Sequence, residues 1–226
     1  MSYKSSFVCL ANSRKLTGRC IAGLELVGGS LRGWVRPVSR TENGELQSER
    51  FYAGYKDPKL LDVIEIEFLS ERNPRLRPED RFFQNARSWV RTGVFDRAGL
   101  TPFIEQVSGG LWADGDSTSN GLNDRIPADL ARSLPTTLKL IQPTTLKMYV
   151  QTEGASFGKP KRKVRGQFRI GRFDYILAVT DPVVETEFRG LPEGTSKTVA
   201  APILCLSVSE VFEKQDACYK LIAGVI

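Results

Sequence analysis

The sequence predicts an all-β protein with a few short helices, built as two tandem small barrels. Short apolar or alternating runs, rich in β-branched and aromatic residues, recur along the 226-residue chain, which is the pattern of strands. These runs fall into two successive sets of about five, with a stretch of turn-forming residues between them. Two such sets match two small barrels better than a layered α/β fold.

The first half of the chain contains one helix signal and several strand signals. In residues 60–69, Ile64, Ile66 and Phe68 alternate with more polar residues, which favours a strand with one buried face. Residues 100–107 are predicted to form a short helix, with Thr101 as its cap and Pro102 in its first turn. The predicted strands are residues 6–11, 32–38, 60–69 and 88–95.

The second half begins with a stretch rich in Gly, Asp, Ser and Asn at residues 109–124. We expect this stretch to be a loop or linker between an N-terminal domain, 1–108, and a C-terminal domain, 125–226. A short helix is predicted at 126–134, with Asp124 as a cap and Pro127 near its start. The predicted strands are residues 137–141, 145–152, 164–170, 173–180, 203–211 and 220–226.

Positive charge is concentrated at the start of the chain. Residues 1–41 contain seven Lys or Arg and one acidic residue, Glu25, while the rest of the chain is balanced, so the net charge of +6 arises there. Residues 12–20 are predicted to run from a strand into a turn that offers hydroxyls, backbone amides and cations suited to phosphate. The candidate contacts in this turn are Asn12, Ser13, Arg14, Lys15 and Arg19.

A second candidate lies in residues 32–36, where Arg32, Trp34 and Arg36 should share one strand face. Such a face could combine base stacking with charge, as single-strand binders do. In the alternative interpretation, Trp34 belongs to the core and the two arginines lie at its rim. The sequence favours neither interpretation over the other.

The third candidate is the basic segment 159–172, which has no acidic residue between Glu153 and Asp174. Its first half is expected to be a mobile basic hairpin or loop, and Arg165, Gln167 and Arg169 to share one strand face. Runs of like charge are also common in solvated loops, which is the alternative. The candidate contacts are Lys161, Arg162, Lys163, Arg165, Arg169 and Arg172.

Several classes of function are excluded or disfavoured. The chain has no histidine, so Ser-His and Cys-His catalysis are excluded within it. The four cysteines form no CxxC pair, so we expect reduced structural thiols rather than a zinc site. Neither a Walker loop nor a dinucleotide-binding glycine motif is present, and we predict no cofactor, no metal and no catalytic residue. No apolar run is long enough for a membrane span, and we expect a cytoplasmic protein.

Five short blocks of the chain resemble a family of bacterial proteins, the dual OB-containing domain proteins. The blocks are LANSRKLTGRC at 10–20, IAG at 21–23, GWVRPVS at 33–39, LDVIEI at 61–66 and YILAVTDP at 175–182. This resemblance implies two OB-type barrels, in agreement with the strand pattern. OB folds commonly bind single-stranded nucleic acids or oligosaccharides. The resemblance transfers no catalytic residues.

The sequence therefore favours a nucleic-acid-binding module for single-stranded DNA or RNA, without chemistry of its own, acting within a larger bacterial system. Trp34, Phe173 and Trp89 are the candidate stacking residues. An alternative is an enzyme or sensor for nucleotides or modified bases, with Cys20 or Asp181 beside the basic residues. A further alternative is an adaptor whose basic faces bind acidic protein partners.

Overall fold

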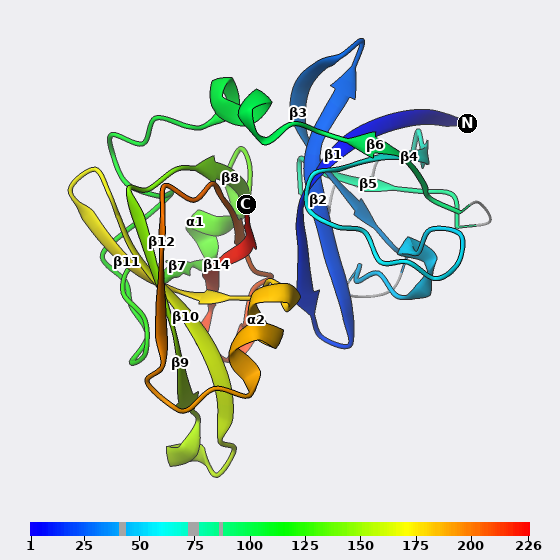
Figure 1. The fold of residues 1–226 in the computed structure, drawn as a ribbon. Helices are drawn as coiled ribbons and strands as arrows, with labels where there is room; N and C mark the ends of the chain where they lie inside the picture. The colour runs from blue at the N-terminus through cyan, green and yellow to red at the C-terminus, as the bar shows by residue number, and fades with distance from the viewer. Residues whose placement is uncertain (41–43, 72–76, 86–87) are drawn as a thin grey trace. The chain divides into compact units, whose positions relative to one another are not determined.

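The computed structural model describes residues 1–40, 44–71, 77–85 and 88–226 (Figure 1). About 50% of the residues lie in strands and only a few in short helices, which confirms the predicted all-β class. The chain divides into two compact units, Met1–Pro102 and Phe103–Ile226. Among the described residues, no helix is long and apolar enough to cross a membrane.

The first unit is a Greek-key barrel. Strands β1, β2 and β3 form an antiparallel meander, β5 pairs with β3 in parallel, and β4 pairs with β1. A bridge between Phe68 and Phe83 joins the end of β4 to the residue after β5, so the strands close on themselves. The elements are β1 (Ser2–Lys15), β2 (Gly18–Val27), β3 (Ser30–Val38), η1 (Ser48–Arg50), β4 (Asp62–Leu69), β5 (Asp80–Phe82), β6 (Val90–Val94) and η2 (Arg97–Phe103).

The apolar side of β4 faces the core of this barrel, as its alternation predicts. Ile64, Ile66 and Phe68 are buried with residues of β1 and β2. Strand β2 was not predicted, because its apolar residues do not alternate. It approaches β1 so closely that a Cβ on Gly23 would lie 1.8 Å from the carbonyl oxygen of Val8, so only glycine fits. The helix expected at 100–107 is instead η2, which begins at Arg97 and contains Pro102.

The second unit repeats this arrangement. Strands β9, β10 and β11 form a meander, β14 runs parallel to β11, and β13 pairs with β14. Strand β12 pairs with β9, and β13 follows it after a turn at Ala201, so β12 and β13 together close the barrel. The elements are β7 (Arg125–Pro127), α1 (Ala128–Arg132), β8 (Leu138–Ile141), β9 (Thr145–Glu153), η3 (Ala155–Phe157), β10 (Lys161–Ile170), β11 (Phe173–Val179), α2 (Pro182–Arg189), β12 (Ser196–Ala200), β13 (Leu204–Val208), η4 (Glu213–Gln215) and β14 (Ala217–Val225).

Residues 109–124 are a loop of the second unit. Leu111 is fully buried in its core. Leu122 exchanges two backbone hydrogen bonds with Ile176 of β11, and β7 pairs with β14. The end of this loop and β7 thus supply strand partners to β11 and β14, which pair directly with each other at only two positions.

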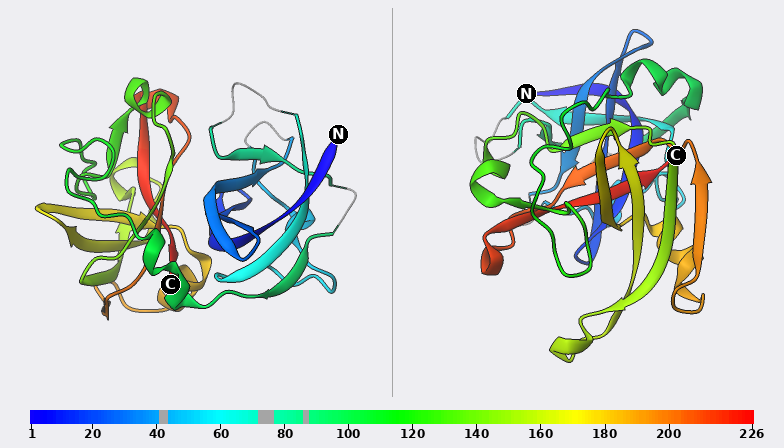
Figure 2. Two further views of the ribbon diagram at one scale, coloured as in Figure 1. Left: turned by 90° about the horizontal axis from the view of Figure 1, so that it is seen from above. Right: turned by 90° about the vertical axis from the view of Figure 1, so that its left-hand side faces the viewer.

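Three local predictions in the second unit need correction. Residues 126–134 contain the shorter α1, preceded by strand β7, and Asp124 does not cap it. Helix α2 was not predicted, although Asp181 caps it by accepting a hydrogen bond from the Val183 N–H at 2.9 Å. The strand predicted at 164–170 begins earlier, at Lys161, so that residues 161–163, expected in a mobile hairpin or loop, belong to the regular strand β10. The long β9–β10 hairpin and η3 at its tip are visible at the bottom of the right-hand view of Figure 2.

Candidate nucleic-acid interface

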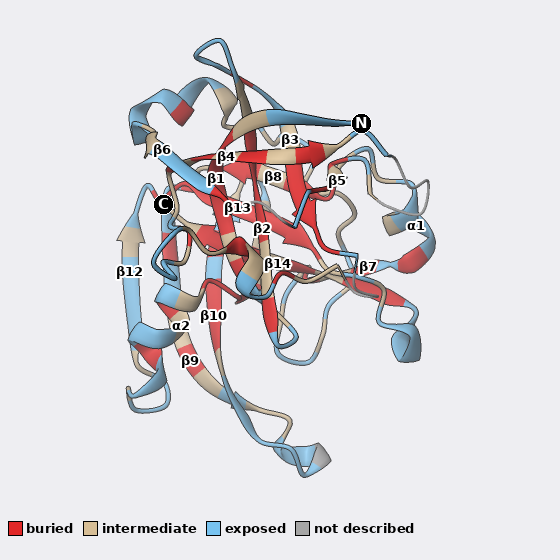
Figure 3. Ribbon diagram, turned by 90° about the vertical axis from the view of Figure 1, so that its right-hand side faces the viewer, coloured by how far each residue is buried: buried red, intermediate tan, exposed pale blue. Residues whose placement is uncertain are grey.

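Barrels of this type bind oligonucleotides across their second and third strands and the loop between the first two. In the second unit the second and third strands are β10 and β11, and β10 also pairs with the first strand, β9, on its other side. Met148, Val164 and Leu177 point into the core. Since neighbouring residues of a strand point to opposite sides, the residues next to them face outward. Figure 3 shows the mixture of buried and exposed residues along these strands.

The outward side of β9 and β10, here called the β9–β10 face, combines cations, amides and one aromatic ring. Across the two strands, Lys147 lies opposite Gln167, and Tyr149 lies opposite Arg165. Gly166 permits the tight curvature here, because a Cβ at this position would lie 2.4 Å from the Ile222 side chain in the core. The face consists of Lys147, Tyr149, Gln151, Glu153, Lys161, Lys163, Arg165, Gln167 and Arg169.

The cations of this face differ in their availability. Lys147 and Lys161 are exposed and form no ion pair with any described residue. Lys163 is half-buried. Arg169 is exposed and forms two hydrogen bonds of 2.7 Å with Asp174. Such an exposed pair is weak and solvent-screened, so a phosphate could compete with Asp174 for Arg169.

Arg165, predicted as a phosphate contact, is buried instead. Its guanidinium donates to Glu153 at 2.7 and 2.9 Å and to Asp124 at 3.3 Å. Although burial works to raise the pKa of Glu153, the hydrogen bonds from Arg165 keep that pKa below its usual value. Arg165 is therefore already neutralised by two carboxylates and does not offer its charge to a ligand.

Arg162 and Arg172, two other predicted contacts, lie off this face. Arg162 alternates with the outward residues and donates to the carbonyl of Leu191. Arg172 lies in the turn after β10, with its guanidinium 5.1 Å from the centre of the Phe173 ring. Of the six cations predicted in segment 159–172, the strand brings four onto one face and leaves these two elsewhere.

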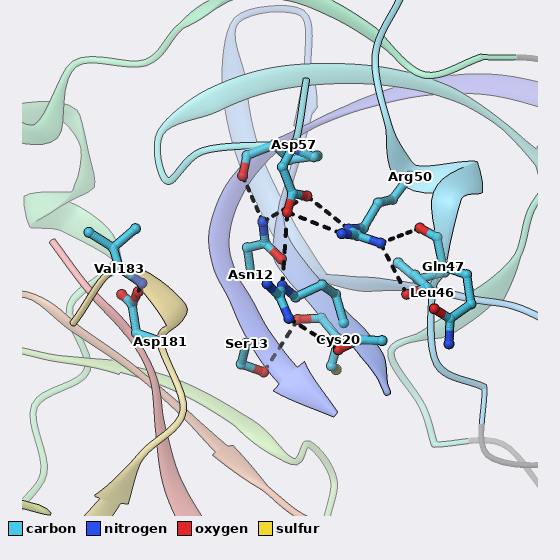
Figure 4. A network of polar contacts seen from close by, with 12 residues as sticks. Asn12, Ser13, Cys20, Leu46, Gln47, Arg50, Asp57, Asp181 and Val183 are labelled. Carbon is cyan, nitrogen blue, oxygen red and sulfur yellow. Dashed lines mark hydrogen bonds and ion pairs between the residues drawn. The ribbon is translucent and has the colours of Figure 1, made fainter. Parts of the chain in front are cut away.

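In the first unit, Asn12 and Arg19 belong to a structural network (Figure 4). The Asn12 amide donates to the carbonyl of Pro58 at 2.7 Å and to Asp57 at 3.3 Å. Asp57 also accepts from Arg50 at 2.8 and 3.1 Å, and the Nε of Arg19 lies 3.9 Å from its carboxylate. These contacts hold the connection between β3 and β4 against the β1–β2 hairpin.

The other residues of this hairpin have different surroundings. Ser13 is buried, and its hydroxyl donates to the carbonyl of Cys20 at 3.4 Å. Arg14 is exposed and lies across the strand pair from Arg19, and Lys15 is half-buried beside the turn. Arg14, Lys15 and Arg19 thus lie close together at the end of the hairpin.

The predicted Arg32, Trp34 and Arg36 face is only partly formed. Arg32 is exposed and Trp34 half-buried. Arg36 is only 3% exposed and donates to Glu79 and Asp80, each at 3.0 Å. Burial raises the pKa of Asp80 despite its ion pair with Arg36. Arg36 is thus a buried ion-pair residue and does not contact solvent as predicted.

Two other predicted stacking residues are also engaged in packing. Trp89 is 2% exposed in the core of the first barrel, against Phe7 and Phe83. Phe173 packs against the core of the second barrel. Trp89 is thus enclosed in the core, and the half-buried Phe173 ring already has the Arg172 guanidinium over it.

The structure also contains a buried polar cluster that the sequence did not reveal. The side chain of Lys220 is 0% exposed, and its Nζ lies 2.5 Å from Asp114, which also accepts from the Tyr175 hydroxyl at 2.7 Å. Burial lowers the pKa of Lys220 and raises that of Tyr175. The cluster fastens residues 109–124 to β11 and β14. Within the described residues, no group of three or more His, Cys, Asp or Glu could hold a metal ion.

Lys147 and Tyr149 are the candidate site residues that sequence reasoning missed. Their signal is the alternation of polar and apolar residues along β9, where Leu146, Met148 and Val150 form the inward side. The strand was predicted, but its outward side was not compared with the charged strand that follows it.

No curated protein and no solved structure matches the chain. A family model, described as the dual OB-containing domain, matches residues 5–225. This match spans both units, and in each unit the sheet contains a three-stranded meander with a parallel partner on its third strand, as in an OB-type barrel. The chain therefore belongs to the dual OB-containing domain family.

Proposed function

We propose that the protein binds single-stranded nucleic acid through the β9–β10 face and carries out no chemistry on it. The observation that carries this proposal is the outward side of β9 and β10, where exposed lysines, amide side chains and an aromatic ring are presented together. Lysines neutralise phosphates, amides bind base edges, and aromatic rings stack on bases, which are the contacts of single-strand binders.

The second barrel supports this proposal better than the first. In the first barrel the strands that correspond to β9 and β10 are β1 and β2, where Val8, Leu10, Ala22 and Leu24 are buried and carry no charge. The cations of the first barrel, Arg14 and Arg32, lie nearer the ends of its strands. We assign them an accessory role, in which they attract the polyanion or hold a second part of it.

The geometry gives no support to the enzymatic alternative. Arg19 and Cys20 are neighbours in β2, so their side chains point to opposite sides of the strand. The carboxylate of Asp181 accepts hydrogen bonds from the N–H groups of Val183 and Val225 at 2.9 and 3.2 Å. That carboxylate therefore has a structural role at the start of α2.

The test is a fluorescence-anisotropy titration with single-stranded DNA, single-stranded RNA and duplex at two salt concentrations. The variant Lys147→Ala/Lys161→Ala removes both exposed lysines of the face. We expect it to weaken single-strand binding by about tenfold and to make the remaining binding less sensitive to salt.

The matched control is Arg132→Ala/Arg189→Ala, which removes two exposed cations of the same unit from α1 and α2. It lowers the net charge equally and should leave the affinity nearly unchanged. Equal losses in the two variants would show that net charge matters and the face does not. An absence of oligonucleotide binding at low salt, together with salt-sensitive binding to an acidic protein, would favour the adaptor alternative.

A further inference from the structure

We infer that Tyr149 is a stacking platform for an unpaired base, and that it makes the β9–β10 face selective for single strands over duplex. This inference rests on the proposed function and adds a specificity-determining residue to it. Tyr149 is the one aromatic residue among the outward-facing positions of β9 and β10.

The ring of Tyr149 is not part of the hydrophobic core of the second barrel. Its neighbours Met148 and Val150 are buried in the core, whereas Tyr149 is half-buried on the opposite side of the strand and does not join the core cluster. Its hydroxyl forms no hydrogen bond with any described residue. Proteins that bind single strands stack bases on aromatic side chains that lie beside cations on a strand surface.

Tyr149 is surrounded by groups that suit the rest of a nucleotide. On its own strand, Lys147 and Gln151 project to the same side, two residues away in each direction. Across the sheet, Arg165 lies opposite it on β10 and Ser196 lies opposite it on β12. A base on the ring would therefore have an exposed lysine and amide groups within the reach of neighbouring strand positions.

Arg165 limits how far this site can rearrange. Its guanidinium is held by Glu153 on β9 and by Asp124 from the loop 109–124, so it cannot turn toward a ligand without breaking buried ion pairs. Arg165, which lies opposite Tyr149 across the strand pair, therefore keeps one conformation, and this part of the site needs no reordering on binding. Arg165 is thus a positioning residue.

The ionisation of Tyr149 is compatible with this role. Burial raises the pKa of its phenol, and the effect of nearby Glu153 adds to this, although Arg165 acts in the opposite direction. The ring therefore stays neutral at physiological pH and does not repel phosphate.

Single-strand selectivity follows from what each ligand offers to the ring. The bases of a duplex are stacked on each other, and their faces are covered. The bases of a single strand expose their faces, and each stacking contact contributes substantially regardless of sequence. Lysine contacts to phosphate, in contrast, are available to both ligands.

The test compares Tyr149→Leu, which keeps apolar bulk and removes the ring, with Tyr149→Phe, which keeps the ring and removes the hydroxyl. Binding of one single-stranded oligonucleotide and its duplex is titrated over a range of salt concentrations. We expect Tyr149→Leu to weaken single-strand binding by roughly tenfold or more. Its duplex affinity and the salt dependence of binding should match the wild type, because no phosphate contact is lost. Tyr149→Phe should bind like the wild type.

Two sets of results would overturn the inference. Wild-type single-strand affinity in Tyr149→Leu would remove the stacking role, and a loss in Tyr149→Phe as large as in Tyr149→Leu would assign the contact to the hydroxyl. If Lys147→Ala/Lys161→Ala weakens binding while Tyr149→Leu does not, the proposed function stands and this inference fails. If the wild type binds no oligonucleotide at low salt, both the proposed function and this inference fail. Both also fail if the wild type binds a neutral oligosaccharide that Tyr149→Leu does not bind.

Discussion

At the scale of single residues, strand alternation decides which side a cation faces, but its partners decide whether that cation can bind a ligand. Lys161 and Arg165 share the outward side of β10. Lys161 is exposed, whereas Arg165 is buried between Glu153 and Asp124. Arg36 is neutralised in the same way by two carboxylates that lie more than forty residues later in the chain. Each buried arginine therefore stabilises one arrangement of distant segments.

The Glu153–Arg165 pair predicts a pH dependence of stability. The pKa of Glu153 is lowered in the folded protein, so its contribution to stability is complete above its usual value of 4.5. That contribution is lost as the pH falls through the lower, folded-state pKa. Glu153→Gln should cost about 2 kcal/mol at neutral pH, because charged hydrogen bonds in a mostly buried site are lost. Urea denaturation should show that this difference from the wild type shrinks in acid.

A suitable control is Glu187→Gln, which removes a carboxylate of the same unit from an exposed ion pair with Lys197. Exposed pairs contribute less than about 1 kcal/mol, so the control should change stability little at any pH. A cost for Glu153→Gln that is equally large in acid and at neutral pH would contradict the prediction, because it would then arise from packing rather than from charge.

The hydrogen-bond and ion-pair partners of individual residues were the feature least predictable from the sequence. Asn12 and Arg19 were predicted within one segment that runs from a strand into a turn, yet their contact with Asp57 depends on how the connection between β3 and β4 folds back. Nothing in the local sequence specifies that path. Tyr149 was missed for a related reason. Its role as a candidate site residue depends on Arg165 across the sheet rather than on its neighbours in the chain.

At the scale of elements, an alternation of apolar and polar residues predicted strands reliably, but the absence of this alternation did not exclude a strand. β4 and β11 were predicted because one side of each is apolar. β2 was missed because residues on both of its sides are largely apolar or small, so no period of two appears. Helix α2 carries an Asp-Pro start signal, but the residues that follow it were interpreted as a turn. For both β2 and α2, the local residue types were compatible with more than one structure, and packing against the rest of the barrel decides which one forms.

The composition of residues 109–124 did not distinguish a loop that packs into the second barrel from a linker between domains. Its Gly, Asp and Ser content is typical of a linker, but Leu111 is fully buried in the second core. We predict that Leu111→Ala will destabilise the second barrel by about 2 to 5 kcal/mol, because it leaves a cavity. Hydrogen exchange measured by mass spectrometry should then increase in β11 and β14 and remain unchanged in β1 to β4.

Leu122→Ala is the matched control, since Leu122 lies in the same loop but is 38% exposed. Its backbone pairing with Ile176 does not depend on the side chain, so exchange in β11 should change little. If both variants leave exchange in β11 and β14 as in the wild type, residues 109–124 do not contribute to the second core and act only as a connection.

At the scale of the whole molecule, the chain joins two barrels of the same order with different distributions of charge. The surplus of cations lies within the first 41 residues, in the first barrel, whereas the strand face best suited to a single strand lies in the second. Two weak sites in one chain bind a long ligand more tightly than either site alone, because the second contact is intramolecular. Under the proposed function, a strand long enough to contact both barrels should therefore bind more tightly than a strand that contacts one of them.

This arrangement predicts a dependence of affinity on oligonucleotide length. One OB barrel covers roughly 4 to 16 nucleotides, so a short strand should occupy the β9–β10 face alone, and a longer strand should also meet the exposed Arg14 and Arg32. Anisotropy titrations with strands of increasing length should show a gain in affinity beyond one site. Arg14→Ala/Arg32→Ala should abolish this gain and change short-strand affinity no more than Arg132→Ala/Arg189→Ala does. If the variant instead weakens short and long strands equally, the first barrel acts through its overall field and not as a second contact.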